Sequence, residues 1–362
     1  MEILLPFAMQ CYSMQKLAYI NFQKTPDDIY DAFEIQSFDD DANGKGILVI
    51  GYRKDFQLDL YAQPSLHLSR SFYDVIEKGI HSFNERKMAN TTFTIDAQGL
   101  RMNITFKDLN GREIHIEAWE NVEKRKPFSL LAPMGFIIDR PENLLLVYLH
   151  HYDYVPKKGS VINLSIAGKE LPIDPLPVPM DFVANYFARY SNQPNIVGFN
   201  PTHKGAIETF TINPGDRSLH ERGMRISLVW NGSQEVAVKR IRSLTSLYPV
   251  SVDFKPAFPN LLTLPDGSNI KGQFTIKELP QCGVIGGTYT IEKNLGHMHV
   301  TMVPDRGWAP RYTKLSVRLL YFLAKLYTRW PADYQWDAYM EQDALGQWLM
   351  TSSWKNNYAK SK

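Results

Sequence analysis

Cysteine is nearly absent from this chain. Only two cysteines occur among 362 residues, Cys11 and Cys282, and they stand far apart in the sequence. So few thiols exclude a framework of disulfide bonds and a zinc site built on closely spaced cysteine pairs. Sparse use of cysteine is typical of proteins in a reducing compartment. We therefore expect the protein to reside in the cytoplasm.

An excess of charge of either sign is also missing. The 40 lysines and arginines nearly balance 38 aspartates and glutamates, and the formal net charge is +2. The chain as a whole therefore lacks the excess of positive charge that is typical of proteins that bind nucleic acid. The longest apolar run, around 315–326, contains Arg318 and Lys325, which excludes a membrane-spanning helix. The first residues lack a cationic leader and are interrupted by Pro6, so no signal peptide is expected.

Several catalytic motifs are missing as well. The chain contains no G-x-S-x-G, no Walker-type phosphate loop, no G-x-G-x-x-G and no H-E-x-x-H. These absences argue against the hydrolases, nucleotide-binding enzymes and zinc proteases that depend on such motifs. Neither cysteine stands in the surroundings of a nucleophile. We expect no cofactor.

Alternation of apolar and polar residues with a period of two is the dominant pattern that the chain does contain. This pattern marks half-buried strands. It predicts strands at 46–53, 55–62, 91–97, 100–107, 112–119, 144–154, 160–167, 333–341 and 346–354. The Asn-Gly pair in DLNG (108–111) predicts a tight turn, so 91–119 should form a three-stranded antiparallel meander.

Two helices are predicted in the first half. Apolar residues three or four apart indicate a helix over 69–86: Phe72, Ile76, Ile80 and Phe83. A second helix is predicted before the strands, with Thr25 as its cap and Pro26 at its first position. Asp27 and Asp28 would then lie in its first turn, where acidic side chains are favourable.

Two similar stretches indicate an internal repeat. TTFTIDAQGLRMNITFKDLNG (91–111) and GTYTIEKNLGHMHVTMVPDRG (287–307) align without gaps at an offset of 196 residues. Between them, a proline-rich segment at 172–180 favours a stiff, extended spacer. We therefore expect a mainly β protein of two antiparallel β-barrel domains, 1–171 and 181–362.

Two tandem barrels, each with about eight meandering strands and a helix, resemble the two-domain lipocalin-like (calycin) proteins. That group includes carotenoid hydratase-like and tocopherol cyclase-like proteins. The resemblance rests on the repeated T-[FY]-T-I-[DE] strand, the proline-rich spacer and the C-terminal tryptophans: Trp330, Trp336, Trp348 and Trp354. It implies that the chain carries or converts a large apolar molecule. The G-x-W motif of single-domain lipocalins is not evident, and the resemblance assigns no catalytic residue.

The stretch VYLHHYDYVP (147–156) holds the first candidate site. Strand geometry predicts one face that suits a ligand pocket or the covered side of a sheet edge: Tyr148, His150, Tyr152 and Tyr154. His151 and Asp153 should share the other face, about 7 Å apart, and form a candidate catalytic pair. Because His150 and His151 point to opposite faces, they cannot ligate one metal ion.

Two further strands carry histidines. In EIHIEAW (113–119), His115 and Trp119 are candidate ligand contacts, although a solvent-facing strand has the same pattern. In GHMHV (296–300), His297 and His299 face the same way, and Asp305 is a possible third metal ligand. A solvated or pocket-facing stripe is the alternative for this pair.

The C-terminal region offers aromatic and basic candidates. Trp330 and Trp336 are expected to border a pocket. The segment 313–330 is predicted to be a helix with one basic stripe: Lys314, Arg318, Lys325 and Arg329. Its apolar face consists of Leu319, Phe322, Leu323, Leu326 and Trp330. Such a helix either lies on an anionic membrane or packs over a barrel end with its charges in water.

The leading hypothesis is a lipocalin-like protein that binds a small or medium apolar molecule, such as a lipid or isoprenoid, in a barrel or between the domains. One alternative is an enzyme of the hydratase, cyclase or isomerase type that acts on an unsaturated apolar substrate. Another is an interaction module that docks through the 313–330 helix. The sequence does not decide the oligomeric state.

Overall fold

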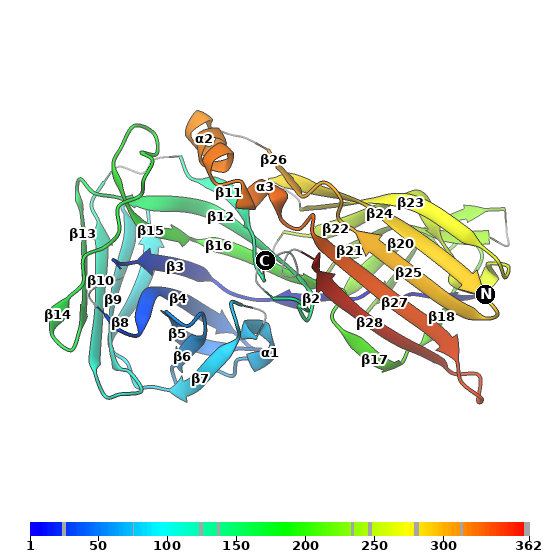
Figure 1. Ribbon diagram of the computed structural model, residues 1–362, viewed down its shortest axis with the longest axis horizontal. Coiled ribbons are helices and arrows are strands. Elements are labelled where there is room, and N and C mark those ends of the chain that lie inside the picture. The colour runs from blue at the N-terminus through cyan, green and yellow to red at the C-terminus, as the bar shows by residue number, and fades with distance from the viewer. Residues whose placement is uncertain are drawn as a thin grey trace.

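The computed structural model describes residues 1–23, 27–74, 76–122, 126–135, 138–232, 235–244, 248–278, 282–311 and 314–357. Strands take up 61% of the residues and helices 6%, which confirms the mainly β class. The sheets are curled, and one forms a half-barrel. Figure 1 shows two lobes along the long axis, a first lobe at the left and a second lobe at the right. No helix in the described part is long and apolar enough to cross a membrane.

The first lobe contains a larger and a smaller sheet. The larger consists of β2 (Met9–Tyr12), β3 (Lys16–Asn21), β4 (Tyr30–Asp40), β5 (Gly44–Arg53), β6 (Leu58–Ala62), β7 (Ile80–Glu85), β11 (Phe128–Ala132), β12 (Leu144–Pro156), β15 (Asn185–Ser191) and β16 (Gln193–Phe199). Their order is β2-β16-β12-β15-β3-β4-β5-β6-β7, with β11 also paired to β12. The smaller consists of β8 (Ala89–Asp96), β9 (Gly99–Lys107), β10 (Glu113–Glu120), β13 (Ser160–Ile166) and β14 (Lys169–Glu170). Its order is β14-β13-β10-β9-β8.

The second lobe is built on one large sheet. Its strands are β17 (His203–Ala206), β19 (Ser218–Glu221), β20 (Met224–Asn231), β21 (Glu235–Ser243), β22 (Val250–Pro259), β23 (Asn269–Glu278), β24 (Gly283–Asn294), β25 (His297–Val303), β26 (Trp308–Pro310), β27 (Tyr334–Gln342) and β28 (Trp348–Asn356). The order is β17-β28-β27-β25-β24-β23-β22-β21-β20-β19, with β26 on β24. The remaining elements are β1 (Glu2–Leu4), β18 (Thr209–Thr211), η1 (Leu261–Thr263), α1 (Arg70–Tyr73), α2 (Leu315–Leu323) and α3 (Leu326–Arg329). Every strand that the alternation predicts is present.

The two sheets of the first lobe pack face to face. Along β4, Phe33 and Ile35 belong to the core between the sheets, together with Ile104 and Ile116 of the smaller sheet. The alternate β4 side chains, such as Glu34, project from the opposite face, as strand geometry requires. Because both faces of the larger sheet are covered, β4, β6 and β12 are buried along most of their length.

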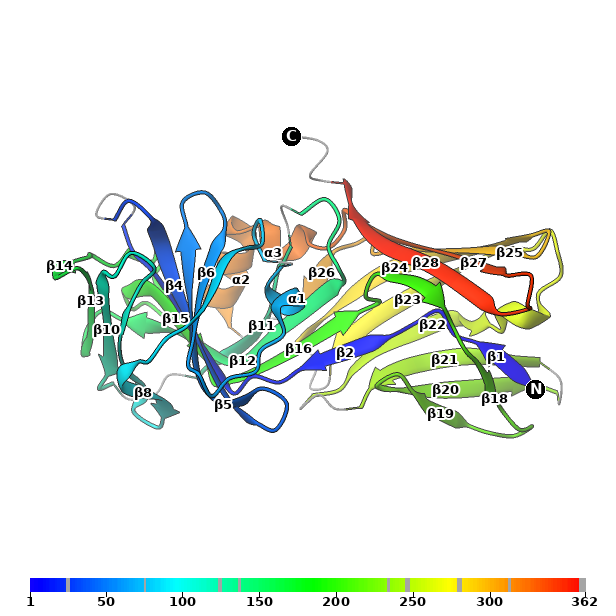
Figure 2. The ribbon, with the colours of Figure 1, turned by 90° about the horizontal axis from the view of Figure 1, so that it is seen from below.

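The N-terminal segment joins the lobes. β1 pairs with β18 of the second lobe, whereas β2 pairs with β16 of the first, and Figure 2 shows this blue segment running between the lobes. Phe7, between β1 and β2, is fully buried. Its ring contacts Phe199 from the first lobe and Phe254, Phe258 and Trp336 from the second, with a centroid distance of 4.9 Å to Phe258.

The proline-rich segment does not coincide with the passage between lobes. β15 and β16 follow it in sequence, yet they pair with β3 and β12 of the first lobe. Within the segment, Ile173 bridges to Phe22 and Pro175 to Tyr186, so it lies against the first lobe. After β1, the chain returns to the second lobe only beyond Phe199. The division into domains 1–171 and 181–362 stays a prediction.

The helix predicted over 69–86 is wrong beyond its first turn. α1 ends at Tyr73, and Gly79 adopts a φ of +86°, which a continuing helix does not permit. The apolar residues that follow form β7, which pairs in parallel with β6. The four apolar residues at helical spacing therefore do not belong to one helix: Phe72 lies in α1, and Ile80 and Phe83 lie in β7.

The predicted N-terminal helix is also wrong where it can be compared. Thr25 and Pro26 lie outside the described residues. Asp27 does not sit in a helical turn, because β4 begins at Tyr30; its carboxylate accepts hydrogen bonds from the backbone N–H groups of Ile29 and Tyr30, at 3.0 and 2.8 Å. The same carboxylate lies 2.6 Å from Arg112, which ties β4 to the turn between β9 and β10.

The internal repeat and the two closed barrels are not confirmed. The first aligned hairpin turns at Ala97 and Gln98, and the second at Leu295 and Gly296. The offset of 196 would align the second turn with residues 99 and 100, so the two turns do not coincide. In the described residues, β8 ends its sheet, whereas β24 lies inside one.

Replacing Phe7 with alanine removes a ring that touches both lobes, so we expect the free energy of unfolding to fall by about 3–5 kcal/mol. Urea-induced unfolding followed by tryptophan fluorescence measures this. Phe182→Ala is the matched control, because Phe182 is 99% exposed and its loss should change the free energy by less than about 0.5 kcal/mol. Equal effects of the two substitutions would contradict a role of Phe7 in joining the lobes.

Candidate functional site

A cavity of about 340 Å³ lies on the larger sheet of the first lobe, on the face turned away from the smaller sheet. Side chains from β3, β4, β5, β12, β15 and β16 line its floor, and β11, the segment after it and α3 line its sides. The lining residues are Met14, Leu17, Tyr19, Glu34, Gln36, Tyr52, Phe72, Ile76, Glu77, Leu130, Ala132, Pro133, Met134, Gly135, Val147, Leu149, Tyr152, Arg189, Ile196, Leu326 and Tyr327. A mostly apolar lining with a few polar groups is typical of small-molecule sites.

A β-bulge in β12 decides which of its side chains reach the cavity. Leu149 pairs with Leu130 and Tyr152 with Phe128, so β12 has one residue more than β11 over this stretch. His151 takes up the extra length with a φ of +48°. As a result, Leu149 and Tyr152 both line the cavity although they are three residues apart.

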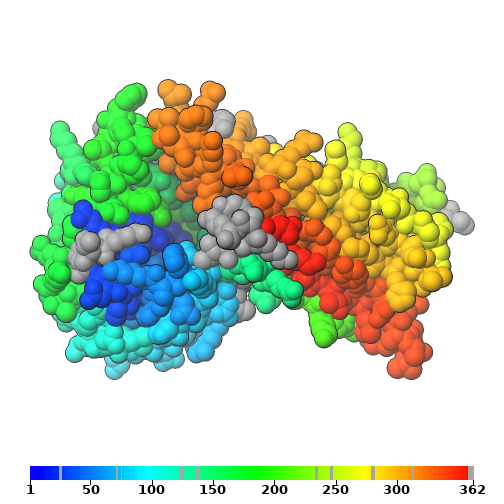
Figure 3. All heavy atoms as spheres, viewed as in Figure 1, coloured from blue at the N-terminus to red at the C-terminus, as the bar shows by residue number. Residues whose placement is uncertain are grey.

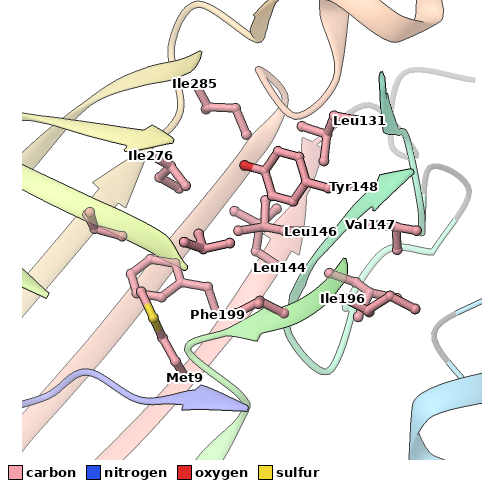
Figure 4. Close-up of a cluster of buried hydrophobic side chains, with 14 of the residues drawn as sticks. Met9, Leu131, Leu144, Leu146, Val147, Tyr148, Ile196, Phe199, Ile276 and Ile285 are labelled. Atoms are coloured by element: carbon pink, nitrogen blue, oxygen red, sulfur yellow. The ribbon is translucent and has the colours of Figure 1, made fainter. Parts of the chain in front are cut away.

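The prediction of one tyrosine–histidine face on β12 is wrong, because the bulge changes the direction of the later side chains. Figure 4 shows Tyr148 among Ile276 and Ile285 of the second lobe, while its neighbour Val147 points the other way beside Ile196. His150 also faces the second lobe. Tyr152 and Tyr154 lie on the cavity side instead, with their rings 5.5 Å apart. The four residues predicted to share one face are therefore divided between two.

A row of polar and aromatic side chains crosses the cavity floor. Tyr154 is the cross-strand neighbour of Arg189, Arg189 of Tyr19, and Tyr19 of Glu34. Directly opposite residues in antiparallel strands point to the same face, within contact distance. The row therefore extends over β12, β15, β3 and β4.

Glu34 is the buried acid of this row. Its Oε2 accepts a hydrogen bond from the Tyr52 hydroxyl at 2.7 Å, and its Oε1 accepts one from Gln36 Nε2 at 2.6 Å. Gln36 in turn accepts from the Tyr73 hydroxyl of α1 at 2.9 Å. Burial raises the pKa of Glu34 above its ordinary value, although Tyr52, Gln36 and the charge of Arg189 oppose the rise. Compared with a carboxyl group in water, Glu34 is therefore easier to protonate.

Arg189 is the cation of the row. Its guanidinium lies 4.1 Å from the ring centroid of Tyr19 and 4.5 Å from that of Phe187, and it donates a hydrogen bond to Asn21 Oδ1. Within the part of the chain that the structure describes, no carboxylate lies within ion-pair distance of Arg189. A guanidinium among aromatic rings is stabilised by cation–π contacts but keeps unused donors for an anion.

The predicted pair His151 and Asp153 does not converge on a cavity. His151 is exposed, as expected for the extra residue of a bulge. Asp153 is buried, and its cross-strand neighbour Tyr190 belongs to the core between the two sheets of the first lobe. The extra residue breaks the alternation that would have put both side chains on one face.

His150 belongs to a buried polar cluster between the lobes. Its Nε2 lies 2.8 Å from Glu278 Oε2, and its Nδ1 lies 2.9 Å from Ser129 Oγ. Asn195 donates hydrogen bonds to Glu278 and to the backbone oxygen of Tyr248. Burial raises the pKa of Glu278, although His150 and Asn195 oppose the rise. Because the cluster joins β12 and β16 to β23, it contributes to the interface between the lobes and not to the cavity lining.

The other predicted ligand contacts lie away from the cavity. His115 and Trp119 project from the outer face of the smaller sheet, where Trp119 is 40% exposed. Trp336 is fully buried in the second lobe. Trp330 is buried too, but its Nε1 donates to the backbone oxygen of Met134 at 2.9 Å, so it supports a segment that lines the cavity.

The three predicted metal ligands, His297, His299 and Asp305, do not converge on one point. His297 lies 3.0 Å from Glu341, and His299 lies 3.1 Å from Asp337, each across strands of the second lobe. Asp305 is exposed in the turn beyond β25 and lies 3.6 Å from Arg306. Among the described residues, no three His, Cys, Asp or Glu side chains are arranged to hold one metal ion. His297 and His299 instead line an open hollow of about 340 Å³ on the surface of the second lobe.

Glu34 and Arg189 are the site residues that the sequence alone did not reveal. Each carried a signal, because both are charged residues inside aromatic, alternating stretches, AFEIQSF (32–38) and YFARYS (186–191). The polar face of a strand looks the same in sequence whether it meets solvent or a cavity. Only the three-dimensional covering by α3 and β11 distinguishes the two.

Comparison of the chain with protein-family models, with curated proteins and with solved structures finds no match.

The raised pKa of Glu34 predicts a pH-dependent stability. A carboxyl group with a higher pKa in the folded state binds protons more tightly there, so the free energy of unfolding falls as the pH rises above the unfolded pKa of about 4.3. Below that pH both states are protonated and the cost is absent. Glu34→Gln cannot ionise, so part of the decline that begins above that pH should disappear in urea unfolding experiments.

Glu208→Gln is the control for this experiment, because Glu208 is exposed. We expect its pH profile to follow that of the wild type. If Glu34→Gln retained the full wild-type slope, Glu34 would not be the source of the decline.

Proposed function

We propose that the protein binds a small or medium, mainly apolar molecule that carries one anionic group, and that the cavity of the first lobe is the binding site. The apolar part would contact Leu17, Val147, Leu149 and their neighbours. The anionic group would be held by Arg189. The observation that carries the proposal is a half-buried guanidinium, at the floor of an apolar cavity, that no carboxylate of the described residues neutralises.

The chemistry of the neighbours supports this arrangement. The raised pKa of Glu34 makes its protonation easier when a ligand carboxylate binds beside it, and the neutral acid would not repel that carboxylate. The hydroxyl of Tyr19 belongs to the same cavity lining and can donate a hydrogen bond to an oxygen of the ligand. A charge-assisted hydrogen bond from Arg189, in a place shielded from water, contributes more than a neutral one.

Arg189→Met should weaken the binding of dodecanoate by roughly 10-fold to 100-fold, because a charge-assisted hydrogen bond is lost. Binding is measured by displacement of fluorescent 11-(dansylamino)undecanoate. Methyl dodecanoate serves as the matched ligand without charge, and its affinity should change less than about 3-fold.

A second substitution separates the cavity from the cation. Leu149→Trp fills the cavity, so both dodecanoate and its methyl ester should be displaced. If Arg189→Met weakened the acid and the ester equally, the anionic group would be the wrong part of the proposal. If Leu149→Trp bound both as well as the wild type, the cavity itself would be wrong.

The second candidate function is a hydratase, cyclase or isomerase acting on an unsaturated apolar substrate. One observation favours it: Glu34 is easier to protonate inside an apolar cavity than a carboxyl group in water, so it can serve as a proton donor. Protonation of a carbon–carbon double bond by Glu34 would leave a carbocation and a Glu34 carboxylate. Addition of water with transfer of one of its protons to Glu34, or loss of a neighbouring proton to Glu34, would complete the reaction; in a cyclase, attack by a second double bond would first move the cation, and loss of a proton to Glu34 would then follow.

Incubation with farnesoate in heavy water tests this candidate. Mass spectrometry should detect deuterium in the product, or a gain of one water, with the wild type. Glu34→Gln should abolish conversion while the dansyl probe still binds. Unchanged farnesoate with the wild type would leave the binding function standing and remove the case for catalysis on this class of substrate.

The resemblance to two-domain lipocalin-like proteins, with two barrels and an internal repeat, remains a proposal. Curled antiparallel sheets and an apolar cavity beside a helix support it. The binding proposal does not depend on it, because it rests on the residues of the cavity.

A further inference from the structure

The outward side of α2 is apolar although nothing in the described structure covers it. Leu315, Leu319, Phe322 and Leu323 are spaced along one helical face, and Leu315 and Phe322 are 77% and 71% exposed. The opposite side is apolar as well and packs inward through Val317, Leu320 and Tyr321. A surface helix of a globular protein normally pairs one apolar face with a polar one, so the outward side of α2 is unusual.

A nearby turn extends this surface. Phe182 stands at the tip of the turn between Met180 and Val183, with a φ of +63° and a side chain that is 99% exposed. Asp181, its neighbour, accepts hydrogen bonds from Lys314 at 2.7 Å and Ser316 at 2.9 Å. The turn is therefore attached to the beginning of α2. We call the combined surface of Phe182, Leu315, Leu319, Phe322 and Leu323 the apolar ridge; Figure 3 shows α2, in orange, protruding at this edge of the molecule.

Cations border the apolar ridge. A shallow hollow of about 690 Å³ lies along α2 and α3 and is lined by Arg318, Lys325 and Arg329, with Tyr321, Phe322 and Thr328. The sequence from Gly307 to Ala332 contains five lysines and arginines and no aspartate or glutamate. A hollow with three cations and no acid in its lining suits the phosphate of a lipid head group.

We propose that the apolar ridge and its basic hollow dock the protein onto the surface of an anionic lipid membrane. The five ridge side chains would enter the boundary between head groups and acyl chains, and Arg318, Lys325 and Arg329 would contact lipid phosphates. Charge complementarity favours this occupant over a neutral apolar partner. The inference goes beyond the proposed function and does not require it.

Flotation of the full chain with vesicles tests the proposal. The protein should float with vesicles of equal parts phosphatidylglycerol and phosphatidylcholine, and much less with phosphatidylcholine alone. Raising the salt concentration to about 1 M should weaken binding, because it screens the cations. The double variant Leu315→Ser, Phe322→Ser and the triple variant Arg318→Glu, Lys325→Glu, Arg329→Glu should each lose about 10-fold or more in vesicle affinity.

Matched controls lie on the turns of the second lobe. Leu295 and Leu345 are 81% and 92% exposed, so Leu295→Ser, Leu345→Ser removes two strongly exposed apolar side chains elsewhere and should leave binding unchanged. Thermal unfolding confirms that all variants are folded. Absence of flotation, or flotation that survives the ridge and charge variants, would overturn the proposal. A dimer of the wild type that Leu315→Ser, Phe322→Ser converts to a monomer would also overturn it, because a second copy would then cover the ridge.

Discussion

The extra residue in β12 is the constraint on which the arrangement of both lobes depends. Before His151, the strand sends Tyr148 and His150 into the second lobe and Leu149 into the cavity. With strict alternation, Tyr152 would have followed His150 toward the second lobe, and Asp153 would have entered the cavity. The bulge at His151 reverses this outcome. One strand can therefore serve an interface, a cavity and a sandwich core within thirteen residues.

Because the larger sheet is covered on both faces, polar side chains at either face are shielded from water and need partners within the protein. A buried polar group is costly unless it is hydrogen-bonded. Glu34 meets this demand through Tyr52 and Gln36, and Glu278 meets it through His150 and Asn195. Glu34 belongs to this sheet, whereas Glu278 belongs to β23 of the second lobe and lies against the opposite face of the sheet, beside His150. One faces the cavity, where a ligand can approach, and the other is closed between the lobes.

Arg189 differs from these acids in a way that matters for function. Its aromatic neighbours stabilise the cation without neutralising it, and Asn21 occupies only part of its donor capacity. Packing alone would be served equally well by an apolar residue. The binding proposal therefore accounts for this cation, whereas the packing of the fold alone does not require it.

The strands could be predicted from the sequence because alternation is a local property, and all of them are present. The face to which each side chain points could not be predicted. A bulge such as the one at His151 cannot be recognised in the sequence, yet it reverses the direction of every later side chain in β12. The helix over 69–86 failed because four apolar residues at helical spacing also satisfy a short helix followed by a strand, and Gly79 separates the two. Glu34 and Arg189 come from strands far apart in sequence, so their meeting depends on pairing through Tyr19.

α3 connects the cavity with the basic hollow beside it. Leu326 and Tyr327 line the cavity, while Lys325 and Arg329, on either side of them, line the hollow. Ala324 leaves the helical conformation between α2 and α3, so the two helices are separate pieces and not one rigid rod. A membrane bound at the ridge would therefore contact the element that forms one side of the cavity. If the ligand is apolar and comes from that membrane, its source would lie next to the cavity that binds it. The two proposals are tested independently, and together they would describe the transfer of a ligand from the membrane to the cavity.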